Sequence, residues 1–145
     1  MFAPAAPSSH SPASFAGAYR QVGVETGVAG ASSHHLVVML FDGFNEAVIQ
    51  ARTALSQGRI EAKCKEISRA VRIVDEGLKA PLDVAAGGEL ARNLAALYAY
   101  VTLRLTHANL NNDADALDEC LRLLEPVRAA WLAIGPAAGL GPEVQ

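Results

Sequence analysis

A chain of 145 residues with 51% hydrophobic and 19% charged residues has the composition of one globular domain, which excludes an intrinsically disordered protein. Its 12 basic and 15 acidic residues give a net charge of −3, so the basic excess expected of a nucleic-acid-binding protein is missing. No segment reaches the ~18 uncharged apolar residues of a membrane span, and prolines interrupt the N-terminal segment where a secretory signal needs an apolar run, so we expect a soluble cytoplasmic protein.

The chain divides into an arm, a helical domain and a tail. Residues 1–14 are rich in Ala, Pro and Ser, and residues 135–145 are rich in Gly and Pro, so both are expected to be flexible. Residues 15–134 are predicted to form the domain. It opens with a short segment, 15–24, which contains Tyr19 and is expected to form a brief helix or an extended strap.

Two helices follow, each with apolar residues at alternating steps of four and three, the spacing of one helical face. The first should begin near Ser32 or Ser33, either of which can cap it, and end at Gly58, which suits the left-handed position after a helix. The second should stop before Pro81. The predicted buried stripes are Val37, Phe41, Phe44, Val48, Ala51 and Leu55 in the first helix, and Ile60, Cys64, Ile67, Val71, Val74 and Leu78 in the second.

Two further helices follow a linker at 82–88. The third should end near Asn109, where a turn-forming run at 109–113 supplies the cap of the fourth. The fourth should bend at Pro126 and end at Gly135-Pro136. Four amphipathic helices joined by short loops predict an all-α fold, an antiparallel four-helix bundle with a short N-terminal helix or cap. The stripes are Leu90, Leu94, Leu97, Val101 and Leu105, then Leu117, Leu121, Leu124, Trp131 and Ile134.

Candidate catalytic and metal-binding residues are few. No Glu is followed three residues later by His, the pair that di-iron bundles use, so we predict no metal site. Gly87-Gly88 lacks the Lys and Ser/Thr of a phosphate-binding loop, and no cofactor is predicted. Cys64 and Cys120 form no CxxC pair and lie on apolar faces, which is typical of buried free thiols. A cysteine nucleophile paired with His107 is the alternative for an enzyme.

Three features are unusual for a minimal bundle. Gly43 lies inside the first helix, where glycine costs about 1 kcal/mol relative to alanine. Either packing within the bundle or the close approach of a partner helix would account for it. Tyr98 and Tyr100 lie about 200° apart around the third helix, so at least one should border the surface. The first helix is also apolar beyond its stripe and needs cover on a second side, from the 15–24 segment or from a partner helix.

Seven segments together resemble the flagellin export chaperone family (FliS), in that family's order and spacing from Ala18 to Ile134. Two departures stand out. Ser32-Ser33 replaces the Ser-Pro or Thr-Pro pair frequent before the first long helix, and Ala99 replaces an acidic residue that would be available to a client. The matching segments are Ala18-Tyr19, Leu36-Val-Val-Met-Leu-Phe-Asp-Gly43, Ile73-Val-Asp-Glu-Gly-Leu78, Gly87-Gly-Glu-Leu-Ala-Arg-Asn-Leu94, Leu97-Tyr-Ala-Tyr100, Ala108-Asn109 and Ala130-Trp131.

The resemblance implies an antiparallel four-helix bundle without catalytic activity or cofactor. It implies a cytosolic chaperone that binds the disordered C-terminal region of flagellin, prevents its premature polymerisation and delivers it to the flagellar type III export apparatus. The segment around Tyr19 is then expected to cover an apolar groove and to take part in docking on the export gate. The expected partner-binding residues are Tyr19, Val22, Leu36, Met39, Leu40, Phe41, Gly43, Asn93, Leu94, Tyr98, Tyr100 and Asn109.

Two alternatives from other functional classes stay open. An adaptor bundle in signalling would show the same helical stripes but would not bind flagellin. A small helical enzyme using Cys64 or Cys120 would lose its turnover when the thiols are alkylated, whereas a chaperone needs no thiol.

Overall fold

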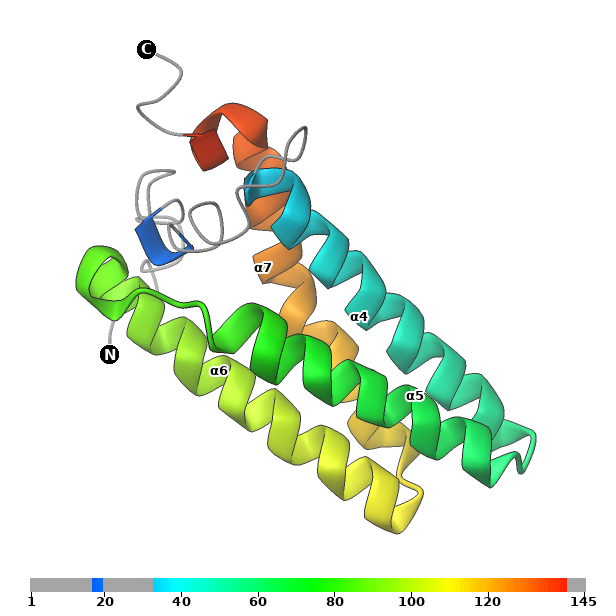
Figure 1. Ribbon diagram of the computed structural model, residues 1–145. Helices are drawn as coiled ribbons and strands as arrows, with labels where there is room; N and C mark the ends of the chain where they lie inside the picture. The colour runs from blue at the N-terminus through cyan, green and yellow to red at the C-terminus, as the bar shows by residue number, and fades with distance from the viewer. Residues whose placement is uncertain (1–16, 20–32, 141–145) are drawn as a thin grey trace.

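The structure is a computed structural model that describes residues 17–19 and 33–140. Four long helical segments follow one another: α4 (Ser33–Ser56), α5 (Ile60–Arg72) continuing as the π-helix η1 (Ile73–Lys79), α6 (Val84–Asn111) and α7 (Ala114–Leu140). Helices joined by short turns run side by side in opposite directions (Figure 1). The predicted all-α bundle is confirmed, and the described residues contain no strand. The arm, Val22, Ser32 and the last five residues lie outside the described part.

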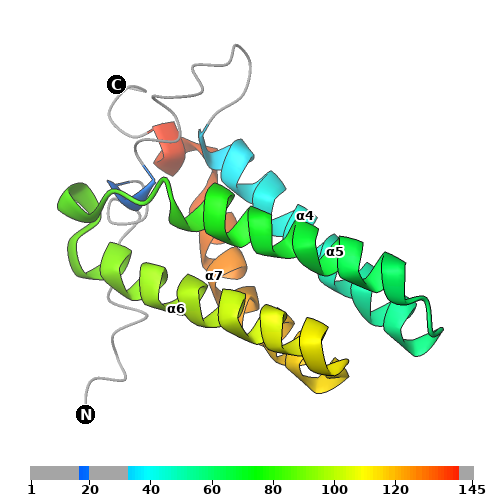
Figure 2. The same ribbon diagram turned by 60° about the horizontal axis from the view of Figure 1, so that its bottom comes forward.

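Each helix packs against two neighbours, so the bundle encloses one core. Helix α4 packs on α5 and α7, and α6 packs on η1, α5 and α7 (Figure 2). The stripe predicted for the first helix is confirmed, with only its last member, Leu55, partly exposed. The buried faces predicted for the third and fourth helices, now α6 and α7, are also confirmed. Their members are buried except for Leu97, Leu121 and Ile134, which are partly buried.

The stripe predicted for the second helix is confirmed except at its start. Ile67, Val74 and Leu78 are buried and Val71 packs partly buried against the core, whereas Ile60 is 47% exposed and Cys64 is half-buried. The inward face also carries Lys63 and Ala70. Sequence patterns assign lysine to solvent, so the burial of Lys63 was not predicted.

The buried ammonium group of Lys63 is satisfied by the end of α6. Its Nζ donates to the carbonyl oxygen of Asn109 at 2.9 Å and to Oδ1 of Asn112 at 2.7 Å. The last carbonyls of a helix have no partner within the helix and carry its negative end, so a cation is favoured there. Lys63 thereby ties α5 to α6 at one end of the bundle.

The predicted turns are largely confirmed. Gly58 is left-handed at φ 71°, and Arg59 N–H donates to the carbonyl of Ala54 at 2.8 Å, as in a Schellman motif. Helix α6 ends two residues later than predicted, at Asn111, with Asn112 left-handed at φ 51°. Oδ1 of Asp113 then accepts from the N–H of Ala116 at 3.2 Å and caps α7, as the turn-forming run predicted.

Two helices contain irregular turns. In η1 the N–H of Ala80 donates to the carbonyl of Asp75, five residues back, and this wider turn ends before Pro81 as predicted. Non-helical dihedral angles inside α7 occur at Gly135 (φ 75°, ψ 172°), where the helix was predicted to end. Pro126 has no such non-helical dihedral angles, so they do not show the bend expected there.

Candidate partner-binding surfaces

Residues Gly17–Tyr19, here called the strap, dock on the start of α6. The carbonyl of Ala18 accepts from the N–H of Asp83 at 2.9 Å. Gly87 permits this approach, because a Cβ there would lie 2.8 Å from the Cα of Ala18. The linker predicted at 82–88 therefore holds a capped helical turn, in which Oδ1 of Asp83 accepts from Ala86 N–H at 3.0 Å and Gly88 (φ 56°, ψ −132°) separates the turn from the rest of α6.

Tyr19 of the strap is buried among aromatic side chains. Its hydroxyl shares a hydrogen bond with the hydroxyl of Tyr98. Its ring meets the ring of Trp131 edge-on, with centroids 5.6 Å apart and planes at 71°. Burial raises the pKa of both tyrosines well above the ordinary value for the phenol, and the neighbouring Tyr98 adds to the rise at Tyr19. Both hydroxyls therefore stay protonated and paired at neutral pH.

The same aromatic cluster joins the start of α4 to α7. Trp131 Nε1–H donates to the carbonyl of His34, and the ring N–H at Nε2 of His34 donates to the carbonyl of Trp131, both at 3.0 Å. The two rings stack with centroids 5.3 Å apart. Tyr19 thus belongs to a fixed cluster and covers the end of the bundle.

Several residues expected to contact a partner are buried in the bundle. Phe41, Leu94 and Tyr98 belong to the core, together with Tyr19. The prediction that at least one of Tyr98 and Tyr100 borders the surface is confirmed, because Tyr98 is buried and Tyr100 is 43% exposed. The buried four position the helices that carry the exposed candidates.

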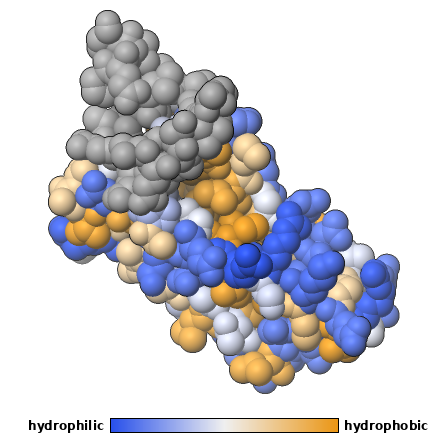
Figure 3. Space-filling view, in the orientation of Figure 1, coloured by the Kyte–Doolittle hydropathy of each residue, from blue (hydrophilic) through white to orange (hydrophobic). Residues whose placement is uncertain are grey.

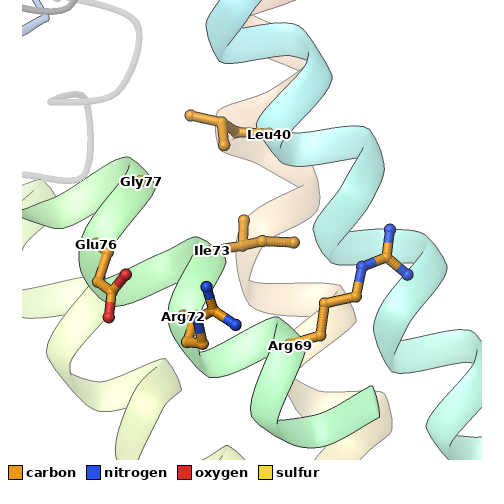
Figure 4. Close-up of a pocket in the computed structure, with 6 residues that line it drawn as sticks. All are labelled: Leu40, Arg69, Arg72, Ile73, Glu76 and Gly77. Carbon is orange, nitrogen blue, oxygen red and sulfur yellow. The ribbon is translucent and has the colours of Figure 1, made fainter. Parts of the chain in front are cut away.

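One candidate on α4 borders an open pocket between α4 and η1. Leu40 and Ile73 point into it in Figure 4, and its volume is about 370 Å³. The lining is completed by Gly77 and three charged residues, Arg69, Arg72 and Glu76. Figure 3 shows an apolar area between α4 and η1, bordered by polar surface. Leu40 is the candidate on α4 that lines this α4–η1 pocket; Met39 is 53% exposed and Leu36 is half-buried, but neither belongs to the lining.

Two glycines bring α4 and η1 together at the pocket. A Cβ on Gly77 would lie 2.9 Å from Cδ2 of Leu40, and a Cβ on Gly43 would lie 3.3 Å from Cδ1 of Ile73. The contact with Ile73 supports packing within the bundle as one reason for Gly43. The approach of a partner helix at Gly43 stays a prediction.

The exposed candidates on α6 belong to a second surface. Asn93 and Tyr100 are exposed, and the same helical line continues to Leu103, 65% exposed, and Leu110, 78% exposed. These residues belong to a stripe with steps of three and four, here called the α6 stripe: Asn93, Ala96, Tyr100, Leu103, His107 and Leu110. The sequence analysis missed Leu103 and Leu110, although this second period was visible beside the buried one.

The α6 stripe is almost free of charge. Between Asn93 and Asn111 the only Lys, Arg, Asp or Glu is Arg104, whose Nε contacts Oε1 of Glu119 at 2.7 Å. Oε2 of the same Glu119 accepts from the hydroxyl of Tyr100 at 2.8 Å. A surface depleted of charge and carrying tyrosine and leucine is typical of the centre of a protein interface. Asn109, also expected at the interface, is half-buried and holds Lys63 through its carbonyl.

Groups suited to other chemistry are scarce in the part of the chain that the structure describes. No three His, Cys, Asp or Glu side chains there are arranged to hold a metal ion. None of the helices searched in that part has the length and apolar character to cross a membrane. Burial raises the pKa of the Cys120 thiol to about 12, which keeps it protonated and unreactive.

Comparison with known proteins gives consistent matches over most of the chain. A family described as flagellar protein FliS matches residues 15–138. The flagellar secretion chaperone FliS of Salmonella typhimurium is 50% identical over 121 residues, which cover 83% of this chain and 90% of that protein. The Escherichia coli protein of the same name is 40% identical, with 79% and 84% covered. The flagellar secretion chaperone FliSB of Pseudomonas aeruginosa is 42% identical, with 78% and 89% covered.

Proposed function

The chain belongs to the FliS family of flagellar secretion chaperones, and from this premise we propose that it binds the C-terminal region of flagellin in the cytoplasm. Binding hides the apolar stripe through which flagellin subunits polymerise. The complex then carries flagellin to the flagellar type III export apparatus. The strap around Tyr19 takes part in docking on the export gate.

The observation that carries this proposal is apolar surface left outside the core, on two sides of the bundle. The α4–η1 pocket offers Leu40 and Ile73, and the α6 stripe offers Tyr100, Leu103 and Leu110. Contiguous exposed apolar surface marks protein contacts. A stripe with steps of three and four receives the matching stripe of another helix, as in helix-in-groove recognition.

The length of the α6 stripe fits a helical segment. From Asn93 to Leu110 it spans about 26 Å, at about 1.5 Å per residue. A client that is disordered when free must fold along this surface, which costs about 2–5 kcal/mol or more of the gross interaction energy. That cost keeps the complex releasable at the export gate.

Calorimetric titration with the C-terminal segment of flagellin from the same organism tests the proposal, with circular dichroism alongside. We expect saturable 1:1 binding with a gain in helix. Leu40→Glu and Leu103→Glu should each weaken it, whereas Ile49→Glu, at an exposed apolar residue outside both surfaces, should not. A folded chain that does not bind the segment would refute the flagellin assignment and leave a helical adaptor with another client.

The same titration separates the chaperone from the enzyme alternative. Alkylating the half-buried Cys64 should leave binding of the flagellin segment unchanged, because the proposed surfaces contain no thiol.

A further inference from the structure

Two oppositely charged side chains at the α4–η1 pocket have no ion partner. Within the described residues, neither Arg72 nor Glu76 has an opposite charge within 4.0 Å. Arg69 on the same rim differs, since its guanidinium contacts Glu46 at 2.9 Å and Glu66 at 3.3 Å. Arg69 is therefore neutralised within the bundle, whereas Arg72 and Glu76 are available to a partner.

Arg72 and Glu76 do not pair with each other, although residues four apart on an α-helix are neighbours and an Arg and a Glu at that spacing attract. Arg72 is the last residue of α5, and Glu76 lies inside η1. In Figure 4 Arg72 lies between Glu76 and Arg69.

The apolar residues of the pocket lie between α4 and this charged edge. Leu40 reaches in from α4 and Ile73 from η1, and both are half-buried, so each has apolar surface left to cover. The pocket therefore combines an apolar centre with one cation and one anion, about one helical turn apart, that no described residue neutralises. A complementary ligand needs an apolar side chain, an anion that faces Arg72 and a cation that faces Glu76.

We propose that the α4–η1 pocket is a docking subsite for one apolar side chain of an amphipathic client helix that carries an acidic and a basic residue about one turn apart. The apolar side chain enters between Leu40 and Ile73. The acid pairs with Arg72 and the base with Glu76. This subsite rests on the proposed function, and its occupant is a helix from the C-terminal region of flagellin.

The order of the two charges fixes the direction in which the client helix lies. A helix placed the other way round would set its acid against Glu76 and its base against Arg72, and like charges disfavour that pose. Apolar contacts alone are non-directional and would accept both orientations. The charged pair thus selects the direction of the client, while Leu40 and Ile73 supply contact area.

A charge swap that keeps the net charge tests the subsite. The double variant R72E/E76R should bind the flagellin C-terminal segment about tenfold more weakly, because two attractions become two repulsions. The matched control is E61K/K65E, an equivalent swap on exposed residues of α5 that do not line the pocket. It should change the dissociation constant by less than about twofold, since surface charges away from the contact contribute little.

Rescue and salt complete the test. A flagellin segment in which the pairing acid and base are exchanged should bind R72E/E76R as tightly as the native pair binds. Raising the salt concentration should shrink the difference between wild type and swap. If wild type binds the segment and the swap binds equally well, the subsite is refuted while the proposed function stands. If wild type does not bind, the proposed function fails first.

Sedimentation of the free protein examines the other occupant of the pocket. We expect that the R72E/E76R exchange does not change the oligomeric state of the free protein. A wild-type dimer that dissociates in R72E/E76R but not in E61K/K65E would assign the pocket to a second copy of this chain and overturn the proposal.

Discussion

The hydroxyl pair of Tyr19 and Tyr98 should be energetically coupled. Both side chains are buried and each hydroxyl is the other's partner, so Tyr19→Phe leaves the Tyr98 hydroxyl buried and unpaired. A buried polar group left without a partner costs about 1–3 kcal/mol, whereas removing both partners together is nearly neutral. We therefore expect each single variant to lose about 1–3 kcal/mol and the double variant Y19F/Y98F to lose clearly less than the sum.

The strap limits the size of the effect at Tyr19. Gly17–Tyr19 can leave the bundle without global unfolding, since local segments open more easily than cores. Once the strap has left, water can reach the Tyr98 hydroxyl. The free energy of unfolding lost in Tyr19→Phe therefore cannot exceed the free energy with which the strap docks on the bundle. In Tyr98→Phe the same limit applies to the part of the loss that comes from leaving the Tyr19 hydroxyl without a partner.

Urea unfolding followed by two probes measures the cycle. Trp131 is the only tryptophan, and its ring contacts Tyr19, so its emission reports the strap and the surrounding cluster. Far-ultraviolet circular dichroism reports the helices. Costs that add to within about 0.5 kcal/mol would show that the hydroxyls are not coupled and would refute the pairing. Tyr100→Phe, whose hydroxyl bonds Glu119 instead, is the control and should add independently of Tyr19→Phe.

Further expectations concern pH, two glycines and the buried lysine. The two buried tyrosines have raised pKa values, so their contribution to stability should be full below about pH 10 and fall above it, because the unfolded state releases protons that the folded state retains. The raised pKa of the Cys120 thiol adds a loss of the same sign that begins near pH 9. Ultraviolet titration and urea unfolding at alkaline pH, in the wild type and in Cys120→Ala, check this. Gly77→Ala should leave urea stability almost unchanged but weaken calorimetric binding of the flagellin segment, since its Cβ would turn the flexible end of Leu40. Gly58→Ala should instead lower the free energy of unfolding in urea by about 1 kcal/mol without affecting binding. The cost comes from the left-handed backbone at φ 71°, since the added Cβ would contact no other atom. Lys63→Met should cost about 1–3 kcal/mol by leaving the half-buried carbonyl of Asn109 unpaired, whereas the exposed Asn112 can bond to water; an unchanged midpoint would contradict the role of that ammonium.

Much of the fold could be predicted where one local rule acts alone. The stripe of α4 combines Phe and Val with Ala at strict helical spacing, and this spacing selected the buried face correctly although the helix carries further apolar residues. Gly58 and the cap at Asp113 follow from backbone geometry within a few residues. These signals are local, so the sequence alone contains them.

The second helix shows where local rules fail. Its inward face includes Lys63, whose burial requires acceptors from the end of α6, far away in the sequence. Gly77, inside the wide turn of η1, likewise meets Leu40 of another helix. No spacing within residues 60–79 carries this information.

The candidate surfaces were predicted in part. The opposition of Tyr98 and Tyr100 was visible in the spacing, but which of them faced outward depended on the position of α7 and Tyr19. Leu103 and Leu110 were missed because the buried stripe of the same helix accounted for its leucines first. Leu40 was predicted as a partner-binding residue. Ile73 and Gly77, which line the other side of the pocket, were named only as part of a segment that resembles the family.

The π-helix also determines where the length of this chain can change. A π-turn holds one residue more than an α-turn between hydrogen-bonded groups, so η1 stores an extra residue within a continuous helix. Deleting one residue there would restore α-helical geometry and leave the segments before and after it close to their present orientation, because the wider turn already absorbs that residue. A deletion in the regular part of α5 would instead turn Lys63 by about 100° relative to Leu78 and remove one of them from the core. Segment 73–79 is therefore the place in this helix where the loss of one residue is best tolerated.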